Sequence, residues 1–408
     1  MPNSLTEVQV LSGKRITLGV TGSIAAYKAV ALASSLVQAG AIVDVAMTES
    51  ATRFVQPLSF QAITHRPVFV DLWAAGMETD IAHVTLGRES ALIVLAPATA
   101  NTLAKLAHGM ADDPVSITVL AARCPVIVAP AMDAGMFTHP ATAANVELLR
   151  KRGVIVVDPE EGHLASGLTG LGRLADPDRI VDCIRATLGA HGDLAGRHVL
   201  VTAGGTQEAL DPVRYITNHS SGKMGYALAE AARDRGAHVT LVTTPTALRT
   251  PGGVSVIAVR TASDMLAAIT ATYAKLDALI MTAAVADFRV ESEAAHKIKR
   301  GETSMDLRLV PNPDLLAATA ALDSRTRPVR VGFAAETQDL LAHAVDKLQR
   351  KSLDLIVAND VSGDVFGSDS NEVTLLWSDG REAALPRIPK TVVAERVLDA
   401  VSELLRRR

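Results

Sequence analysis

Short apolar runs alternate with amphipathic stretches along the whole chain. In the first half, the run RITLGV (Arg15–Val20) predicts a buried strand, and the turn after it leads into a helix expected to reach about Gln38. Four more Val/Ile-rich runs follow in this half, over 41–47, 90–97, 124–130 and 153–159. Runs of this kind separated by helices are typical of a parallel sheet covered on both faces, which predicts an α/β fold.

The same alternation starts again after the Gly-rich polar stretch GAHGDLAGR, which marks a domain boundary. A hairpin is expected to turn at Asp379-Gly380, and the last stretch, KTVVAERVLDAVSELL, has helical periodicity. Further strands are predicted over 198–204, 237–244, 276–284, 330–336 and 353–360. The domain prediction is a flexible N-terminus over 1–13, a first domain over 14–188, a linker over 189–196 and a second domain over 197–408.

Composition narrows the class of protein. The chain has 408 residues and a formal net charge of −4, which argues against general nucleic-acid binding because that function usually needs a basic face. Its two cysteines, Cys124 and Cys183, suggest neither a disulfide framework nor a metal cluster and are expected to be buried thiols. No secretory signal and no membrane span are expected from the pattern, so the predicted compartment is the cytoplasm.

The most informative stretch is TNHSSGKMG (Thr217–Gly225), which follows a predicted strand and opens a helix. Glycines allow close backbone approach, while hydroxyls, free N–H groups and the positive helix end attract an anion. Asn218 stands just ahead of this cradle, where its amide can hold a carbonyl or acyl-phosphate oxygen. The spacing is neither that of a Walker P-loop nor that of a dinucleotide-binding turn.

Other residues of this half suit the activation of a carboxylate by a nucleotide. Asp287 ends a predicted strand, where a carboxylate can meet Mg²⁺ or a nucleotide hydroxyl. Lys297 and Lys299 lie on one face of an extended stretch, and Lys347 and Lys351 lie four apart on one helix face. Taken alone, either pair is better explained as solvated surface lysines.

The run around Asn218 closely resembles the signature of phosphopantothenate–cysteine ligase, the C-terminal half of bifunctional coenzyme A biosynthesis proteins. The motifs AGGT, AAVADF, KIK, NPDLL, GFAAET and KxxxKxxDLIVAND occur in the order of that family, over about 190–400. The resemblance implies that 4'-phosphopantothenate and L-cysteine are joined with CTP and Mg²⁺, that Asn218 stabilises an acyl-cytidylate, that Lys297 assists its formation and that Asp287 meets the metal. It implies that CTP is bound by Met281, Thr282, Ala283, Asp287, Lys297, Pro313, Asp314, Leu315, Leu316, Phe333, Lys347 and Lys351.

In the first half, a single Gly-rich turn after a strand would be weak support for a cofactor site. Four loops in order, GSIAAYK, MTESAT, APATANT and PAM, together resemble the homo-oligomeric flavin-containing cysteine decarboxylase family over residues 14–186. This likeness implies bound FMN, decarboxylation of 4'-phosphopantothenoylcysteine to 4'-phosphopantetheine, and an active-site role for His83. The FMN would be held by Gly22, Ser23, Ile24, Thr48, Ala98, Thr99, Ala100 and Asn101.

Two positions depart from the pattern of that family. Asp133 replaces the asparagine that would bind the substrate carboxylate, and an ionised Asp repels a carboxylate unless it is protonated or counter-charged. Ser166, in the flap ASGLTGLGR, replaces the cysteine that would donate a proton, and an alcohol is a far weaker acid than a thiol. His83, Asp133, His163 and water remain candidates for the proton donor.

The sequence therefore predicts an α/β protein of two Rossmann-like three-layer domains, a flavodoxin-like flavoprotein domain followed by a ligase domain. The predicted function is bifunctional: CTP-dependent ligation and then FMN-dependent decarboxylation. The alternative keeps the ligase and makes the N-terminal half a flavin-binding oligomerisation scaffold, because of Ser166 and Asp133. Two less favoured hypotheses are a nicotinamide-dependent oxidoreductase and a non-enzymatic binding module. By resemblance, the flavin domains form trimers within a dodecamer and the ligase domains form dimers.

Overall fold

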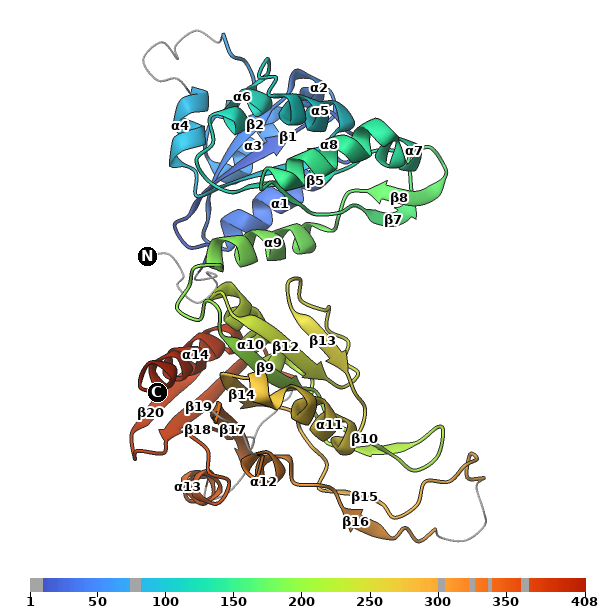
Figure 1. Cartoon of the computed structure of the whole chain (residues 1–408), viewed down its shortest axis with the longest axis vertical. Coiled ribbons are helices and arrows are strands. Elements are labelled where there is room, and N and C mark those ends of the chain that lie inside the picture. Colours follow the sequence, from blue (N-terminus) through green and yellow to red (C-terminus); the bar gives the residue numbers. More distant parts are fainter. Residues whose placement is uncertain (1–9, 74–81, 300–304, 323–326, 337–339, 361–366) are drawn as a thin grey trace. The chain divides into compact units, whose positions relative to one another are not determined.

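The computed structural model describes residues 10–73, 82–299, 305–322, 327–336, 340–360 and 367–408. It divides into two compact units, Met1–Leu188 and Gly189–Arg408, and each is a three-layer α/β structure (Figure 1). The α/β prediction for both halves is therefore confirmed. None of the described helices combines the length and the apolar character that a membrane span requires.

The N-terminal unit is built on a parallel six-stranded sheet with the order β3-β2-β1-β4-β5-β6. Without the two-residue β3 this is the flavodoxin-like order, in which the chain changes direction between β1 and β4. The strands are β1 (Arg15–Val20), β2 (Ile42–Met47), β3 (Val68–Phe69), β4 (Leu92–Ala98), β5 (Val126–Pro130) and β6 (Ile155–Val156). The helices are α1 (Ala26–Gln38), α2 (Glu49–Thr52), α3 (Pro57–Thr64), α4 (Ala82–Glu89), α5 (Ala100–His108), α6 (Pro114–Leu120), α7 (Ala134–Thr138), α8 (Pro140–Lys151) and α9 (Pro177–Gly189).

Both faces of this sheet are covered because its strands are apolar on both sides. Ile16 and Leu18 of β1 pack toward α1, α3 and α9, while Ile93 and Leu95 of β4 pack toward α4, α5, α6 and α8. All four side chains are almost completely buried. The near-continuous apolar runs in the sequence follow directly from this two-sided burial.

The C-terminal unit has an eight-stranded sheet with the order β13-β12-β9-β14-β17-β18-β19-β20. The first six strands of that order are parallel, and β19 and β20 add the predicted antiparallel hairpin, with Gly380 at a φ of 88° in its turn. The strands are β9 (His198–Ala203), β12 (His238–Thr243), β13 (Ser255–Ala258), β14 (Ala278–Met281), β17 (Val329–Glu336), β18 (Leu355–Asp360), β19 (Ser370–Trp377) and β20 (Glu382–Pro389). The helices are α10 (Lys223–Asp234), α11 (Ala262–Thr272), α12 (Leu315–Ala320), α13 (Leu340–Arg350) and α14 (Lys390–Arg406), with a 3₁₀ turn, η1 (Tyr273–Lys275).

Helices cover both faces of the second sheet as well. α10 and α14 lie on one face over Val201 and Ile280, and α11, α12 and α13 lie on the other over Leu279 and Ile356. Figure 1 shows α14 (red) along the face that also carries α10. The helix predicted to open within the SSGK motif is α10, and it begins at Lys223.

Several antiparallel pairs were missed by the sequence prediction because their strands, three to five residues long, are too short to show a period. β7 (Glu160–His163) and β8 (Thr169–Arg173) form a hairpin in the N-terminal unit. In the C-terminal unit, β10 (Gln207–Ala209) pairs with β11 (Tyr215–Thr217), and β15 (Phe288–Val290) pairs with β16 (Leu309–Pro311). Figure 1 shows these pairs projecting from the main sheets.

Described residues of the expected flexible N-terminus and of the expected linker pack against their own units. Residues 10–13 form a turn in which Leu11 is fully buried, while residues 1–9 lie outside the described part. The expected linker 189–196 lies within the C-terminal unit, where a Cβ on Gly189 would lie only 1.9 Å from the carbonyl oxygen of Asp234. Leu194 is also fully buried there. Each segment is fixed on its unit because one of its leucines, Leu11 or Leu194, packs into the hydrophobic core of that unit.

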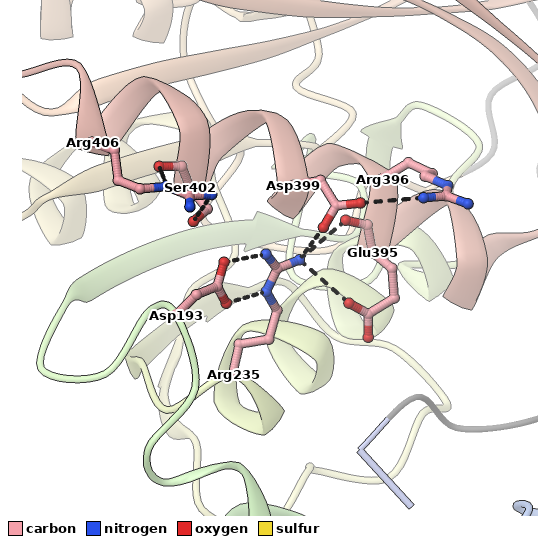
Figure 2. Close-up of polar contacts among 7 residues, drawn as sticks. All are labelled: Asp193, Arg235, Glu395, Arg396, Asp399, Ser402 and Arg406. Carbon is pink, nitrogen blue, oxygen red and sulfur yellow. Dashed lines mark hydrogen bonds and ion pairs between the residues drawn. The ribbon is translucent and has the colours of Figure 1, made fainter. Parts of the chain in front are cut away.

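A cluster of charged residues fixes the segment 189–196 on its unit. Figure 2 shows the Arg235 guanidinium between Asp193 on one side and Glu395 and Asp399 of α14 on the other. The Arg235 side chain is only 14% exposed. Charge-assisted hydrogen bonds at a part-buried arginine therefore join this segment to α10 and α14.

Cys124 and Cys183 are half-buried thiols rather than the fully buried ones expected from the sequence. Burial raises the pKa of the Cys124 thiol. Neither residue lines either of the two cavities described below.

Candidate functional site

The loops after β1 and β4 are joined at the point where the strand order of the N-terminal sheet reverses. The Thr21 hydroxyl donates to the carbonyl oxygen of Pro97 at 2.7 Å and accepts from the backbone N–H of Thr99 at 3.0 Å. A Cβ on Gly22 would lie 2.5 Å from the Cβ of Ser50 in α2, so the close approach of the loop after β1 to the segment after β2 requires glycine. Ligands of open α/β sheets bind at such crevices.

Next to this point lies a cavity of about 300 Å³. It is lined from α1 and the loop before it, from the loop after β5 and from the β7–β8 hairpin, so the sequence-predicted flap forms one of its walls. The lining residues are Ser23, Ile24, Ala25, Tyr27, Lys28, Ala131, Met132, Asp133, His163, Leu164, Ala165, Ser166, Gly172, Arg173 and Leu174.

The flap is held tightly on the loop after β5. The backbone N–H of Met132 donates to the carbonyl oxygen of Gly172 at 3.0 Å, and a Cβ on Gly172 would lie 2.2 Å from the carbonyl oxygen of Met132. The Ser166 hydroxyl donates to Asp133 Oδ2 at 2.7 Å. Asp133 also caps α7, because its Oδ1 accepts from the N–H of Gly135 at 2.9 Å.

In the C-terminal unit, the loops after β9 and β14 meet in the same way. The N–H of Ala284 donates to the carbonyl oxygen of Gly204 at 2.8 Å, and the N–H of Thr206 donates to that of Ala284 at 3.2 Å. The Asn218 side chain reaches this point, where its Nδ2 donates to the carbonyl oxygen of Val285 at 3.0 Å. The predicted signature residue therefore lies at the reversal point of the second sheet.

A cavity of about 610 Å³ lies at the carboxyl ends of β14 and β17. Ten of the twelve residues expected to bind CTP line it, together with six residues that the sequence did not single out. The ten are Met281, Ala283, Asp287, Pro313, Asp314, Leu315, Leu316, Phe333, Lys347 and Lys351, and the six are Thr202, Val285, Ala286, Phe288, Pro311 and Asn312.

Comparison with known proteins covers both units. A family model described as flavoprotein matches residues 5–189, and one described as DNA/pantothenate metabolism flavoprotein C-terminal domain matches residues 194–405. The coenzyme A biosynthesis bifunctional protein CoaBC of Bacillus subtilis is 45% identical over 400 residues, which cover 97% of this chain and 98% of that protein. The chain belongs to the CoaBC family of coenzyme A biosynthesis bifunctional proteins.

The CoaBC protein of Escherichia coli strain K12 is also similar, with 46% identity over 396 residues, 96% of this chain and 97% of that protein. A crystal structure of the C-terminal domain of a CoaBC protein matches with a TM-score of 0.46 and 38% identity, covering 53% of this chain and 100% of that one. The predicted family is confirmed, and the chain is a bifunctional enzyme of coenzyme A biosynthesis. The scaffold alternative is not favoured because the bifunctional relatives match both halves.

Among the residues expected at the flavin, Ser23 and Ile24 line the first cavity. Thr48 and Thr99 cap helices α2 and α5, each accepting a backbone N–H at 3.3 Å. Gly22, Ala98, Ala100 and Asn101 lie in the same loops at the carboxyl edge of the sheet. His83, near the start of α4 and partly buried, does not line this cavity.

Charges on the wall of the first cavity have opposite signs. Burial and then the nearby charge of Arg173 lower the pKa of Lys28, whose Nζ donates to the carbonyl oxygen of Leu174 at 3.3 Å. The hydrogen bond from Ser166 and then that from the Gly135 N–H lower the pKa of Asp133. The Asp133 carboxyl is therefore ionised at neutral pH.

Two of the twelve residues expected to bind CTP, Thr282 and Lys297, do not line the second cavity. The Thr282 hydroxyl instead donates to the backbone carbonyl of Thr202. Lys297 is exposed, on a segment that Asp211 holds through the N–H of Ile298 at 3.1 Å.

The cationic wall of the second cavity is formed by two lysines. Lys347 Nζ donates to the carbonyl oxygen of Phe333 at 2.9 Å, and Lys351 forms an ion pair with Asp314. Burial acts to raise the pKa of Asp314, but Lys351, the N–H of Ala317 and Lys347 outweigh it and lower that pKa. Lys223 of the SSGK motif lies elsewhere, bound to Asp369 at 2.7 Å and to the carbonyl oxygen of Gly367 at 2.8 Å.

Asn312 is the most informative of the residues that the sequence prediction missed. Its side chain donates to the carbonyl oxygen of Ala286 at 2.8 Å, which joins the NPDLL loop to the loop after β14. Its place in that motif, one residue before Pro313, was the available signal. No group of three or more His, Cys, Asp or Glu side chains suited to a metal occurs within the described ranges.

Proposed function

We propose that the chain converts 4'-phosphopantothenate to 4'-phosphopantetheine in two steps. The C-terminal unit joins the acid to L-cysteine with CTP, and the N-terminal unit decarboxylates the product with FMN. The observation that carries this proposal is that each unit has one cavity at the carboxyl edge of its parallel sheet, lined by the motif residues of the corresponding activity.

In the N-terminal unit, FMN fits the loops after β1, β2 and β4. Gly22 allows the first two loops to pack closely, and Ser23, Thr48, Thr99 and Asn101 bring hydroxyl and amide groups to one edge of the sheet. When bound, FMN supplies the two-electron chemistry that activates the carbon losing CO₂. The chain supplies the cationic groups of Lys28 and Arg173, which attract an anionic substrate into the cavity.

His83 keeps its proposed role in the decarboxylase. Because it does not line the cavity of its own chain, we assign it to the site of a neighbouring copy. This assignment agrees with the trimers that the family resemblance implies. Homo-oligomers of this kind, and a cytoplasmic location, stay predictions.

In the C-terminal unit, CTP fits the larger cavity. Lys347 and Lys351 offer positive charge to a triphosphate, and Asp287 and Asp314 on the same wall offer carboxylates to Mg²⁺, which is typically held by one or two carboxylates together with substrate phosphates. The Asn218 amide would stabilise the acyl-cytidylate oxygen. Lys297 would approach the phosphates only if its exposed segment moves toward the cavity.

The test is mass spectrometry of products from the purified full chain given 4'-phosphopantothenate, L-cysteine, CTP and Mg²⁺. We expect 4'-phosphopantetheine. Accumulation of 4'-phosphopantothenoylcysteine would contradict the decarboxylase half, and recovery of unchanged acid would contradict the ligase half. ATP in place of CTP tests the choice of nucleotide.

A further inference from the structure

The two positions that depart from the decarboxylase pattern contact each other, although they are 33 residues apart. Ser166, in the flap, donates its hydroxyl hydrogen to Asp133 Oδ2 at 2.7 Å, and both residues line the first cavity. Ser166 is exposed and Asp133 is half-buried, so a molecule in the cavity can reach the pair.

Decarboxylation has a simple requirement for protons. The carbon that loses CO₂ gains hydrogen in its place, so R–COO⁻ and H⁺ give R–H and CO₂, and each turnover consumes a proton. A serine hydroxyl is too weak an acid to give up its proton at neutral pH unless it receives another. It can nevertheless pass one on if it accepts a proton from a neighbour while it gives up its own.

We propose that Asp133 stores the proton that decarboxylation consumes and that Ser166 delivers it to the substrate carbon. The proposal rests on the decarboxylase function proposed above. Asp133 acts through Ser166 and is a positioning and proton-storing residue, whereas Ser166 touches the reacting atoms.

The negative charge of the substrate controls when Asp133 takes up a proton and when it releases it. In the free protein the carboxyl group of Asp133 is ionised. When a substrate carboxylate enters a cavity of about 300 Å³ beside it, two like charges at close range cannot both remain ionised, and Asp133 takes up a proton from solvent. Loss of neutral CO₂ leaves its electron pair and the negative charge on the rest of the substrate, which is a stronger base than the carboxylate was. The Ser166 hydroxyl proton then moves to the carbon that lost CO₂, the Asp133 proton replaces it on Ser166, and Asp133 is left ionised.

Other titratable groups face Asp133 from the elements around it. Lys28 comes from α1, His163 from β7 and Arg173 from β8, and all three line the same cavity. Lys28 and Arg173 favour entry of the substrate carboxylate, and they are cations that moderate but do not remove its repulsion by Asp133. His163 is a second group that can take up a proton, so the tests must separate it from Asp133.

The first test follows the products that the flavin-loaded full chain forms from supplied 4'-phosphopantothenoylcysteine. Asp133→Asn and Ser166→Ala should each lower formation of the saturated thiol by roughly 100-fold, the lower end of what a positioned acid contributes. A decarboxylated, unsaturated thiol lacking two hydrogens should form in place of the saturated thiol, up to one equivalent per bound FMN, because the two electrons stay on the flavin. The double variant Asp133→Asn/Ser166→Cys supplies a more acidic thiol and should recover most of the saturated product.

The matched control is Thr138→Val. Thr138 lies on the helix that Asp133 caps, and its hydroxyl donates to the carbonyl oxygen of Ala134 at 2.9 Å, outside the cavity lining. This variant should form the product at the wild-type rate. Ligation by the same samples should be unchanged in every variant, which excludes general misfolding.

The second test measures proton uptake by calorimetry in buffers of different ionisation heat. The ligand is the serine analogue of the substrate, which keeps the carboxylate but cannot undergo the thiol chemistry. Wild-type protein should take up close to one proton near pH 7, and Asp133→Asn close to none. Uptake by His163 or Lys28 would persist in that variant and would overturn the proposal.

Formation of the saturated thiol by Asp133→Asn at the wild-type rate would also overturn it. If the wild-type chain forms no decarboxylated product at all, the proposed function fails instead. Proton uptake then still decides whether Asp133 and the ligand carboxylate share a proton.

Discussion

Arg235 holds Asp193 through two parallel hydrogen bonds, from Nε to Oδ1 at 2.8 Å and from Nη2 to Oδ2 at 2.6 Å. The remaining Nη1 donates to Asp399 at 2.9 Å and to Glu395 Oε2 at 3.4 Å (Figure 2). A single cation therefore serves three carboxylates. Because Asp193 belongs to the segment that follows α9, this cluster fixes the start of the C-terminal unit on α10 and α14.

Arg235→Met should destabilise the C-terminal unit by about 3–5 kcal/mol, because it leaves part-buried carboxylates without a counter-charge. Asp193→Asn should cost only about 1 kcal/mol, since its side chain is 39% exposed and solvent screens the pair. Urea unfolding followed by the fluorescence of Trp377 measures both, with the exposed Trp73 replaced by Phe in all samples. Equal losses in the two variants would contradict this ranking.

Glu395 makes the stability of this unit depend on pH. Burial is the main cause that raises the pKa of Glu395 to about 7, with Asp234 and Asp399 adding to it and Arg235 opposing it. A raised folded-state pKa stabilises the fold below the usual value of 4.5, and this contribution is lost as the pH rises through about 7. Glu395→Gln should therefore raise the unfolding free energy by about 1 kcal/mol at pH 8.5, relative to its effect at pH 5.5.

The measurement for Glu395 is the same urea titration at the two pH values. Arg396→Gln is the matched control on the same helix, because Arg396 is exposed and pairs with Asp399 at 3.4 Å. A Glu395→Gln effect of equal size at both pH values would refute the assignment. Asp193 does not interfere, since Arg235 lowers its pKa to about 2 and it stays ionised throughout this range.

Gly172→Ala should impair decarboxylation without affecting ligation. The added Cβ would lie 2.2 Å from the carbonyl oxygen of Met132, so the flap must move away from the loop that carries Asp133. A displacement of about 1 Å at a reacting group can cost roughly 100-fold in rate. Thr169→Ala, at the exposed start of the same strand, should leave the rate unchanged. Decarboxylation at the wild-type rate by Gly172→Ala would show that the flap contact has no catalytic consequence.

Asn218→Ala should lower ligation by roughly 100- to 1,000-fold, as expected for the loss of a hydrogen-bond donor to a developing negative charge. The loss should appear mainly in kcat, because the side chain contacts the carbonyl oxygen of Val285 at the rim of the cavity rather than its nucleotide-binding wall. Release of CMP measures the rate. Decarboxylation of supplied 4'-phosphopantothenoylcysteine is the internal control, and a change confined to KM would contradict the assigned role.

Much of the fold was accessible from local pattern. The run Arg15–Val20 is β1 as predicted, α1 ends at Gln38, and the last hairpin turns at Gly380, because two-sided burial and turn chemistry leave marks within a few residues. The pairs β10–β11 and β15–β16 left no such mark. Their strands are three residues long and only partly buried, so no apolar period identifies them.

The sequence placed some site residues correctly and others not, because local patterns record strand ends but not contacts between distant residues. Most residues expected at CTP line a single cavity, because the motif loops follow the ends of neighbouring parallel strands and must meet at that edge. Thr282 lies in such a loop, but the direction of its side chain depends on the backbone of Thr202, which is 80 residues away. No periodicity in the sequence records a contact of that kind.

The sequence by itself determined two α/β units, the family and the motifs, since burial patterns and loop chemistry are written in neighbouring residues. Only the tertiary structure decided which distant groups meet. It brought Ser166 onto Asp133 and seated the segment of Asp193 against Arg235. Both contacts depend on how a hairpin or a segment packs on a remote loop or helix, and that packing is set by shape and charge across the folded unit.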